Sequence, residues 1–182
     1  AGGTVTLAAP HEDGKADYSA EVGSLASAGG DALVVLGYVD QGGAGVIRGS
    51  LDTGAFDMFA LGDGMIGDAL TANFGGDIDG TIGTAPGSEN AGSAKFAEMA
   101  AAAGIDGTSV YAGESYDAAA LMLLAMAAAG SSNPADYVGK IEMVANAPGE
   151  PIMPGELAKA IEILAAGGDV DYGGATGVEL VG

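Results

Sequence analysis

The sequence predicts an α/β fold: a Rossmann-like parallel sheet flanked by helices, followed by a mostly helical second part. Three observations lead to this prediction. β-Rich runs alternate with helical patterns over the first 86 residues, one of these runs is nearly all apolar, and the residues beyond Pro86 are rich in alanine and methionine at helical spacing. Strands that alternate with helices form parallel sheets with right-handed crossovers. We therefore expect two parts, residues 1–86 and residues 87–182.

The first part has the pattern β-α-β-α-β, with a fourth strand at its end. The 31–38 run, DALVVLGY, is nearly all apolar, as expected for a strand covered on both faces. A helix is predicted over 17–30, with Asp17 as its N-cap and a stop at Gly29-Gly30, and another over 43–54. The predicted strands are residues 4–9, 31–38, 56–61 and 80–85.

The second part is predicted to be helical, with no strand between its helices and one short strand at the end of the chain. The helices are expected at 90–104, 114–130, 133–146 and 154–168. The longest apolar run, 118–130, is shorter than the ~20 residues that span a bilayer, so we expect a buried helix. Without a sheet of their own, the helices should expose apolar faces, formed by Leu121, Leu124, Ile141, Val144, Leu157 and Ile161.

Acidic residues far outnumber basic ones. The chain has 25 Asp and Glu against five Lys and Arg, a formal net charge of -20. Such a surface repels phosphates and anionic lipid headgroups, so nucleic acids and membrane surfaces are disfavoured as partners, and no direct membrane insertion is expected. Screening by salt relieves the self-repulsion, which suits saline surroundings. The first residues lack the basic and apolar regions of a signal peptide.

Catalytic and metal chemistry are poorly supported by the residue types present. The chain has no cysteine, one histidine and no G-x-S-x-G stretch, which removes thiolate nucleophiles, disulfides and Cys-based zinc sites. His11, followed by Glu12 and Asp13, is expected in a solvated loop. The stretches GGDIDGTIG and GGDVDYGG lack the first acid and the closing Glu of an EF-hand, and are predicted as turns that enter strands. We expect no enzyme, no cofactor and no metal.

The stretch GDGMIG, residues 62–67, has the G-x-G-x-x-G spacing of a dinucleotide-binding loop, but its context argues against one. Asp63 would direct negative charge at a pyrophosphate, and the next strand does not end in an acid. A carboxylate between glycines at a strand end suits an ammonium group instead, with a turn-stabilising role for Asp63 as the alternative. Asp68 is the expected cap of the next helix. Tyr38 ends the preceding strand, so its ring and the Asp63 carboxylate should converge in one crevice.

Long stretches of the chain resemble the branched-chain amino acid receptors of ABC transporters, which are type I periplasmic binding proteins. The resemblance rests on HEDGKADYSAEVGSLASAGGDALVVLGYVDQGG, LGDGMIGDAL, ESYDAAALMLLAMAAAGS and IEMVANAPGEPIMPGELAKAI. It implies a two-lobed receptor without catalytic activity. Residues 1–86 would form the carboxyl-terminal lobe without its first strand, and residues 87–182 an incomplete part of the other lobe.

The same resemblance implies a ligand site and partners. Asp63 takes the role of the carboxylate that holds the ligand's ammonium group, although the family more familiarly carries Glu there. Tyr38 helps to close the pocket, and Gly64 and Met65 belong to the same ligand loop. The implied partners are an amino acid-like solute such as leucine and the membrane permease of an ABC importer, in the periplasm or another extracytoplasmic space. Because the groups that bind the ligand's carboxylate belong to the other lobe, the isolated chain is expected to bind amino acids poorly. A Rossmann-like enzyme and a sensory ligand-binding domain are the alternatives.

Overall fold

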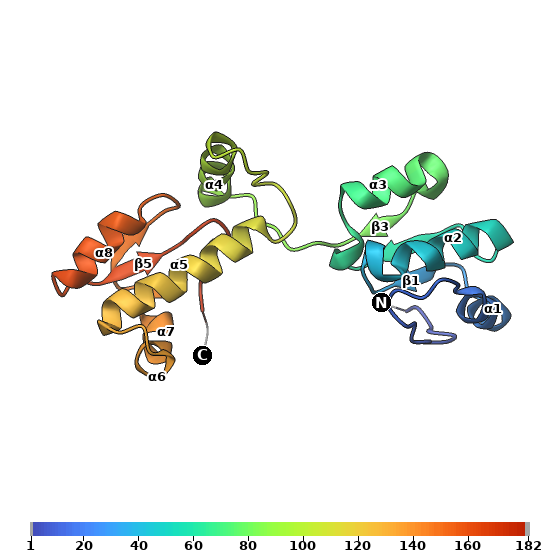
Figure 1. Ribbon diagram of the computed structural model, residues 1–182, viewed down its shortest axis with the longest axis horizontal. Helices are drawn as coiled ribbons and strands as arrows, with labels where there is room; N and C mark the ends of the chain where they lie inside the picture. Colours follow the sequence, from blue (N-terminus) through green and yellow to red (C-terminus); the bar gives the residue numbers. More distant parts are fainter. Residues whose placement is uncertain (1, 181–182) are drawn as a thin grey trace. The chain divides into compact units, whose positions relative to one another are not determined.

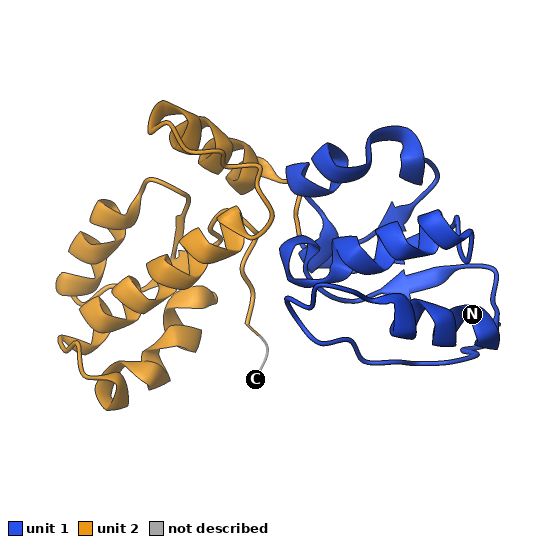
Figure 2. Cartoon of the chain, turned by 45° about the vertical axis from the view of Figure 1, so that its right-hand side comes forward, with its two compact units in different colours: residues 1–86 blue, residues 87–182 orange. Residues whose placement is uncertain are grey.

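The computed structural model describes residues 2–180, and it divides the chain into two compact units, residues 1–86 and residues 87–182 (Figure 2). Each unit contains a small parallel sheet flanked by helices (Figure 1). The predicted α/β fold class is therefore confirmed. The assignment of the two units to the lobes of a receptor stays a prediction.

Unit 1 contains a three-stranded parallel sheet in the order β1-β2-β3. Val35 pairs with Leu61, and Leu61 pairs with Gly83, so the carboxyl ends of all three strands lie at the same edge of the sheet. The elements in chain order are α1 (Ser19–Ala28), β1 (Leu33–Val35), η1 (Val39–Gln41), α2 (Gly43–Thr53), β2 (Phe59–Leu61), η2 (Asp63–Met65), α3 (Asp68–Phe74), η3 (Gly75–Ile78) and β3 (Ile82–Gly83).

One face of this sheet is covered and the other is exposed. The covered face forms the core of unit 1 with side chains from α1, α2 and α3; its members include Leu33, Val35, Phe59, Leu61, Val22, Val46, Ile47, Leu70 and Phe74. On the opposite face, Val34 is 61% exposed and Ile82 is 68% exposed. The expectation that the 31–38 run is covered on both faces is therefore wrong. Right-handed crossovers that add β2 and β3 successively on the same side place α2 and α3 on one face.

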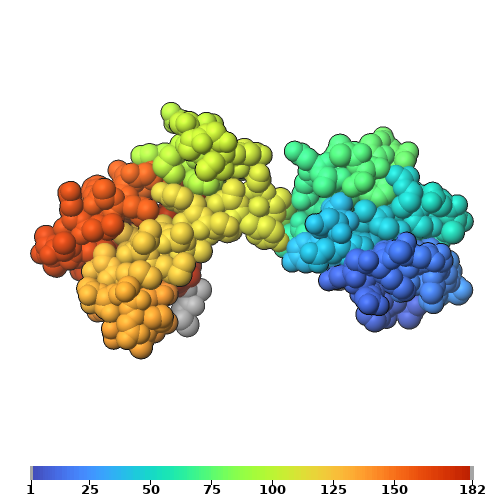
Figure 3. Space-filling model, in the orientation of Figure 1, coloured from blue at the N-terminus to red at the C-terminus, as the bar shows by residue number. Residues whose placement is uncertain are grey.

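The strand predicted at residues 4–9 is also wrong. This segment has no regular structure and is exposed throughout; Val5, for example, is 81% exposed. The Thr6 hydroxyl donates a hydrogen bond to the Gly29 carbonyl (2.7 Å), which holds the segment near the end of α1. In Figure 3 the dark blue amino-terminal part lies on the surface of unit 1. β-Rich composition forms a strand only where a neighbouring strand accepts its backbone hydrogen bonds, and β1 pairs only with β2 among the described residues.

Close packing between α1 and α2 depends on glycines in α2. A Cβ atom on Gly45 would lie 2.6 Å from Cδ2 of Tyr18, and one on Gly49 would lie 3.3 Å from Cγ2 of Val22. Tyr18, at the N-cap position of α1, therefore packs its ring directly on the α2 backbone. The predicted cap, Asp17, instead accepts a hydrogen bond from the Ser19 amide (2.9 Å), one residue before the cap position. That bond and the one from the Ser19 hydroxyl lower the pKa of Asp17.

Unit 2 has a sheet of its own, contrary to the sequence-based expectation. β4 lies between α7 and α8, and it pairs in parallel with β5, with Ile152 opposite Tyr172. Strands of three residues, one of which contains Pro151, carry too little periodicity to be recognised in the sequence. The elements are α4 (Ala91–Ala102), α5 (Ala112–Ala129), α6 (Pro134–Tyr137), η4 (Val138–Lys140), α7 (Ile141–Ala145), β4 (Glu150–Ile152), α8 (Leu157–Ala165) and β5 (Val170–Tyr172).

The sheet of unit 2 is packed by the helices that were expected to be exposed. Leu124 and Val144 are fully buried, Leu121 is buried, and only Ile161 of the six named positions is classed as exposed, at 41%. Helix α4 begins as predicted, with Asn90 and Ser93 in reciprocal capping hydrogen bonds. Over residues 2–180 no single helix has the length and hydropathy to cross a membrane. Helix α5 and the α6–α7 segment have the required length and hydropathy only when taken together, and the pair is bent by 87°.

A buried carboxylate holds the end of unit 2 together. Asp117 of α5 is 3% exposed. Its Oδ1 accepts hydrogen bonds from the Tyr172 hydroxyl (2.7 Å) and the Ala175 amide (2.8 Å), and its Oδ2 accepts two from Thr176, through the amide and the hydroxyl (2.8 Å each). Burial, together with the bond to Asp117, raises the pKa of Tyr172. Four donors thus compensate for the burial of one carboxylate.

Two glycine substitutions test the packing of α1 on α2. We expect Gly45→Ala to destabilise the protein by about 1–3 kcal/mol, because the new methyl group collides with the Tyr18 ring. Gly23→Ala is the matched control within α1, since nothing lies within 4 Å of its Cβ position. That change should stabilise the helix by up to about 1 kcal/mol. Urea unfolding of both variants measures the difference, and equal effects would contradict the packing.

Removing the Asp117 carboxylate should be costly. We expect Asp117→Ala to lower the free energy of unfolding by about 3 kcal/mol or more, because it leaves buried donors from three residues unpaired. Tyr172→Phe, which removes one of the four bonds, should cost only about 1 kcal/mol. The control is Glu162→Gln on the exposed side of α8, with an effect within about 0.5 kcal/mol. A loss for Asp117→Ala no larger than for Tyr172→Phe would refute the anchoring role.

Candidate functional site

The candidate site lies where the loops that follow β1 and β2 meet. Because the two strands are parallel and in register at Val35 and Leu61, the segments after them leave the sheet side by side. The Gly62 amide donates a hydrogen bond to the Val35 carbonyl (3.1 Å), which extends the pairing by one residue. The predicted convergence of Tyr38 and Asp63 starts from this geometry.

Gly64 lies directly against the Tyr38 loop. A Cβ atom on Gly64 would lie 2.5 Å from the Gly37 carbonyl oxygen and 2.8 Å from Cδ1 of Tyr38. Only a glycine allows this contact, so the Tyr38 ring and the Asp63–Gly64 backbone form one continuous surface. Tyr38 is 56% exposed, so more than half of the residue remains accessible beside this contact.

Asp63 is exposed at the same place. It is the first residue of η2, and its Oδ1 accepts a hydrogen bond from the Gly64 amide (2.8 Å). This short bond fixes the carboxylate beside the surface formed by Gly64 and Tyr38. The bond joins Asp63 to the next residue only, and it is compatible with the display of a negative charge next to an aromatic ring.

Met65 anchors the loop from beneath. Its side chain is fully buried in the core of unit 1. A Cβ atom on Gly43 would lie 2.2 Å from Sδ of Met65, so the methionine sits against the first residue of α2. Of the four predicted site residues, Tyr38, Asp63 and Gly64 reach the surface, and Met65 is buried in the core beneath the loop.

The structure explains the glycines of GDGMIG without a phosphate. Gly62 is close to Leu36, with 3.2 Å between its Cβ position and Cδ2 of that leucine, and Gly64 is pressed against Gly37. Gly67 has a φ of +148°, which side chains rarely adopt, at the entrance to α3. The expected capping role of Asp68 is wrong, because Gly67 occupies the cap position and no side chain caps the helix. Asp68 is instead the first residue of α3, where its charge favours the helix dipole.

His11 lies in a loop, as predicted, and its neighbours Glu12 and Asp13 are exposed, but its own side chain is largely buried. Its side chain is 17% exposed, and its ring meets the Tyr18 ring edge to face, with 5.9 Å between centroids. A Cβ atom on Gly37 would lie 3.0 Å from Nε2 of His11. The histidine therefore lies beside Gly37 in the Tyr38 loop. Sequence periodicity gave no signal for this contact, because it joins residues 26 positions apart in two loops.

Nearby charges are paired along the same side of unit 1. The Lys15 ammonium group bonds to the Glu21 carboxylate (2.6 Å), and this bond raises the pKa of Lys15 and lowers that of Glu21. Arg48 of α2 bonds to Asp77 and lies 4.7 Å from the centroid of the Phe74 ring. Both cations are thus held in contacts within unit 1.

The hollows described in the structure lie away from Tyr38 and Asp63. A hollow of about 620 Å³ lies between the start of α1 and α2, and one of about 430 Å³ lies beside α7, and neither is lined by Tyr38 or Asp63. Within residues 2–180, no group of three or more His, Asp and Glu side chains is arranged to hold a metal ion.

A test separates close packing from phosphate binding as the reason for Gly64. We expect Gly64→Ala to destabilise the ligand-free protein by about 1–3 kcal/mol, since the methyl group collides with the backbone of Gly37. Gly76→Ala is the control, because its Cβ position lies 3.8 Å from the nearest atom, a carboxylate oxygen of Asp79. Thermal unfolding without ligand measures both. Unchanged stability of Gly64→Ala would contradict the interlocked loops.

Comparison with known proteins finds one informative relative. Part of the chain is similar to the chemotactic signal transduction system substrate-binding protein BasB of Halobacterium salinarum, with 37% identity over 67 residues. The matched stretch is 37% of this chain and 16% of BasB, so the match spans about a sixth of that protein. No protein-family model matches the chain. No solved structure matches it.

Proposed function

We propose that the chain is part of a substrate-binding protein that captures an amino acid-like solute without chemical change. The single observation that carries the proposal is the meeting of Tyr38, Asp63 and Gly64 at the carboxyl ends of two parallel strands. Ligands of open parallel sheets bind at this edge. The partial similarity to a substrate-binding protein supports the same class of function.

The chemistry of the surface suits an ammonium group. The Asp63 carboxylate supplies a negative charge, and the adjacent Tyr38 ring presents its face or edge to the ligand. A chain with one histidine and no cysteine has few residues for acid–base or nucleophilic catalysis, and His11 is packed against glycines. These features favour binding over the alternative of a Rossmann-like enzyme.

The proposed partners are a small zwitterionic solute and a membrane complex in an extracytoplasmic space. One candidate for that complex is the permease of an ABC importer, as the resemblance to amino acid receptors implies. The other is a chemotactic transducer, which the similarity to BasB, a substrate-binding protein of a chemotactic signal transduction system, favours. Deleting the protein from its source organism separates the two: loss of amino acid uptake supports import, and loss of attraction to the amino acid with uptake retained supports signalling.

A charge substitution tests the assigned ligand group. We expect Asp63→Asn to weaken binding of L-leucine by the full-length protein at least about thirtyfold, because the ammonium group loses its charged partner. Asp68→Asn is the matched control, an exposed acid five residues further on that makes no capping hydrogen bond, and its affinity should stay within about twofold of wild type. Isothermal titration measures both. Equal curves for wild type and Asp63→Asn would rule out the role.

A further inference from the structure

The single histidine of the chain lies beneath the loop that carries Tyr38. A methyl group on Gly37 would lie 3.0 Å from Nε2 of His11, and one on Gly42 would lie 3.3 Å from Nδ1. The ring thus touches both ends of the segment 37–42. A backbone hydrogen bond from Gly14 to the Gln41 carbonyl (3.2 Å) ties the histidine's own loop to the same segment.

Gly37 is held between His11 and the candidate site. Its carbonyl oxygen would be 2.5 Å from a Cβ atom on Gly64, while its own Cβ position faces the imidazole ring. The contact with Gly64 is so close that only glycine fits there, and a methyl group on Gly37 would fit only if the imidazole ring moved by a few tenths of an ångström. A change in the position or charge of the His11 ring therefore acts on Tyr38 and Gly64 through Gly37 alone.

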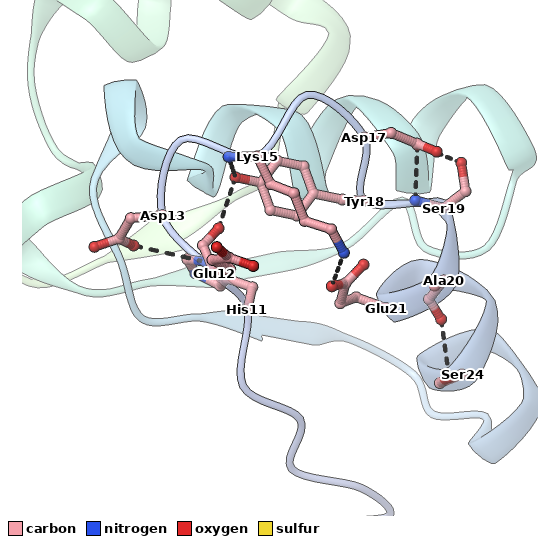
Figure 4. Close-up of polar contacts among 10 residues, drawn as sticks. All are labelled: His11, Glu12, Asp13, Lys15, Asp17, Tyr18, Ser19, Ala20, Glu21 and Ser24. Atoms are coloured by element: carbon pink, nitrogen blue, oxygen red, sulfur yellow. Dashed lines mark hydrogen bonds and ion pairs between the residues drawn. The ribbon is translucent and has the colours of Figure 1, made fainter.

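The ring has an unsatisfied atom and an acidic neighbour. Nδ1 of His11 is buried and has no hydrogen-bond partner among the described residues, and the Asp13 carboxylate is 4.0 Å away (Figure 4). An added proton on the ring would give Asp13 a charged partner. The other ionisable residues around the ring are Glu12 beside it in its own loop, Lys15, Tyr18 and Glu21 on the α1 side, and Tyr38 and Asp40 in the 37–42 segment.

We propose that His11 is a positioning residue for the Tyr38 loop, and that protonation of its ring weakens binding of an ammonium group at Asp63. The inference rests on the proposed function. A protonated ring places a positive charge beside Gly37, whose carbonyl lies against Gly64, and this charge repels a cationic ligand. The attraction between the charged ring and Asp13 also moves the ring on which the loop rests.

The first test is the pH dependence of L-leucine affinity in the full-length protein. Wild type should bind about threefold or more weakly at about pH 5.5 than at about pH 7.5, the range over which histidine side chains change charge. His11→Gln removes this titration and should bind with similar affinity at both pH values. The same pH step in wild type and in His11→Gln, or no step in wild type, overturns the inference.

The second test needs no ligand. In protein labelled with ¹⁵N-glycine, the amide resonances of Gly37 and Gly64 should shift together over the same pH range in wild type and stay fixed in His11→Gln. Gly139, which has nothing within 4 Å of its Cβ position in unit 2, is the control. Shifts without leucine binding would refute the proposed function and retain the coupling. Leucine binding without shifts at Gly64 would retain the function and refute the coupling.

Discussion

The parallel pairing of β1 with β2 is the constraint on which the candidate site depends. The register that puts Val35 opposite Leu61 fixes where both strands end. The two loops that follow these strands therefore lie at the same edge of the sheet. Their contact is then completed by the absence of side chains at Gly37 and Gly64. The Tyr38 ring and the Asp63 carboxylate lie at the same surface because the strands before them end at the same edge of the sheet. Neither loop could hold that arrangement alone.

The two units form their cores differently from a sequence rich in glycine and alanine. Unit 1 uses glycines to bring backbone elements close, so that a few large side chains such as Phe59 and Ile47 fill the core. Unit 2 has many small side chains in its core and adds a polar anchor, in which the Asp117 carboxylate gathers donors from the segment after β5. Its hydrogen bonds fix the course of a segment that offers little apolar area of its own.

The neighbouring placement of the candidate-site residues was partly predictable, and their role in ligand binding stays a prediction. Tyr38 and Asp63 were found from their position after predicted strands, a signal that lies within a few residues of each. The burial of Met65 and the contact of His11 with Gly37 were not found. Both depend on packing between loops, where the sequence has no period, and a glycine in the sequence does not say which neighbour it makes room for.

The sequence by itself determined most of the helices and the parallel β-α-β order of unit 1, because periodicity, caps and glycine stops act within a few neighbouring residues. Helices α2 and α5 accordingly lie where the pattern predicts them. The helix predicted over 133–146 is instead divided into α6, η4 and α7. Only the tertiary structure decided which extended segments became strands. Residues 4–9 have strand composition and no partner, whereas 150–152 form β4 because β5, some 20 residues later, accepts their hydrogen bonds. A strand forms only when a neighbouring strand pairs with it, and the strand's own residues do not specify which segment that neighbour is.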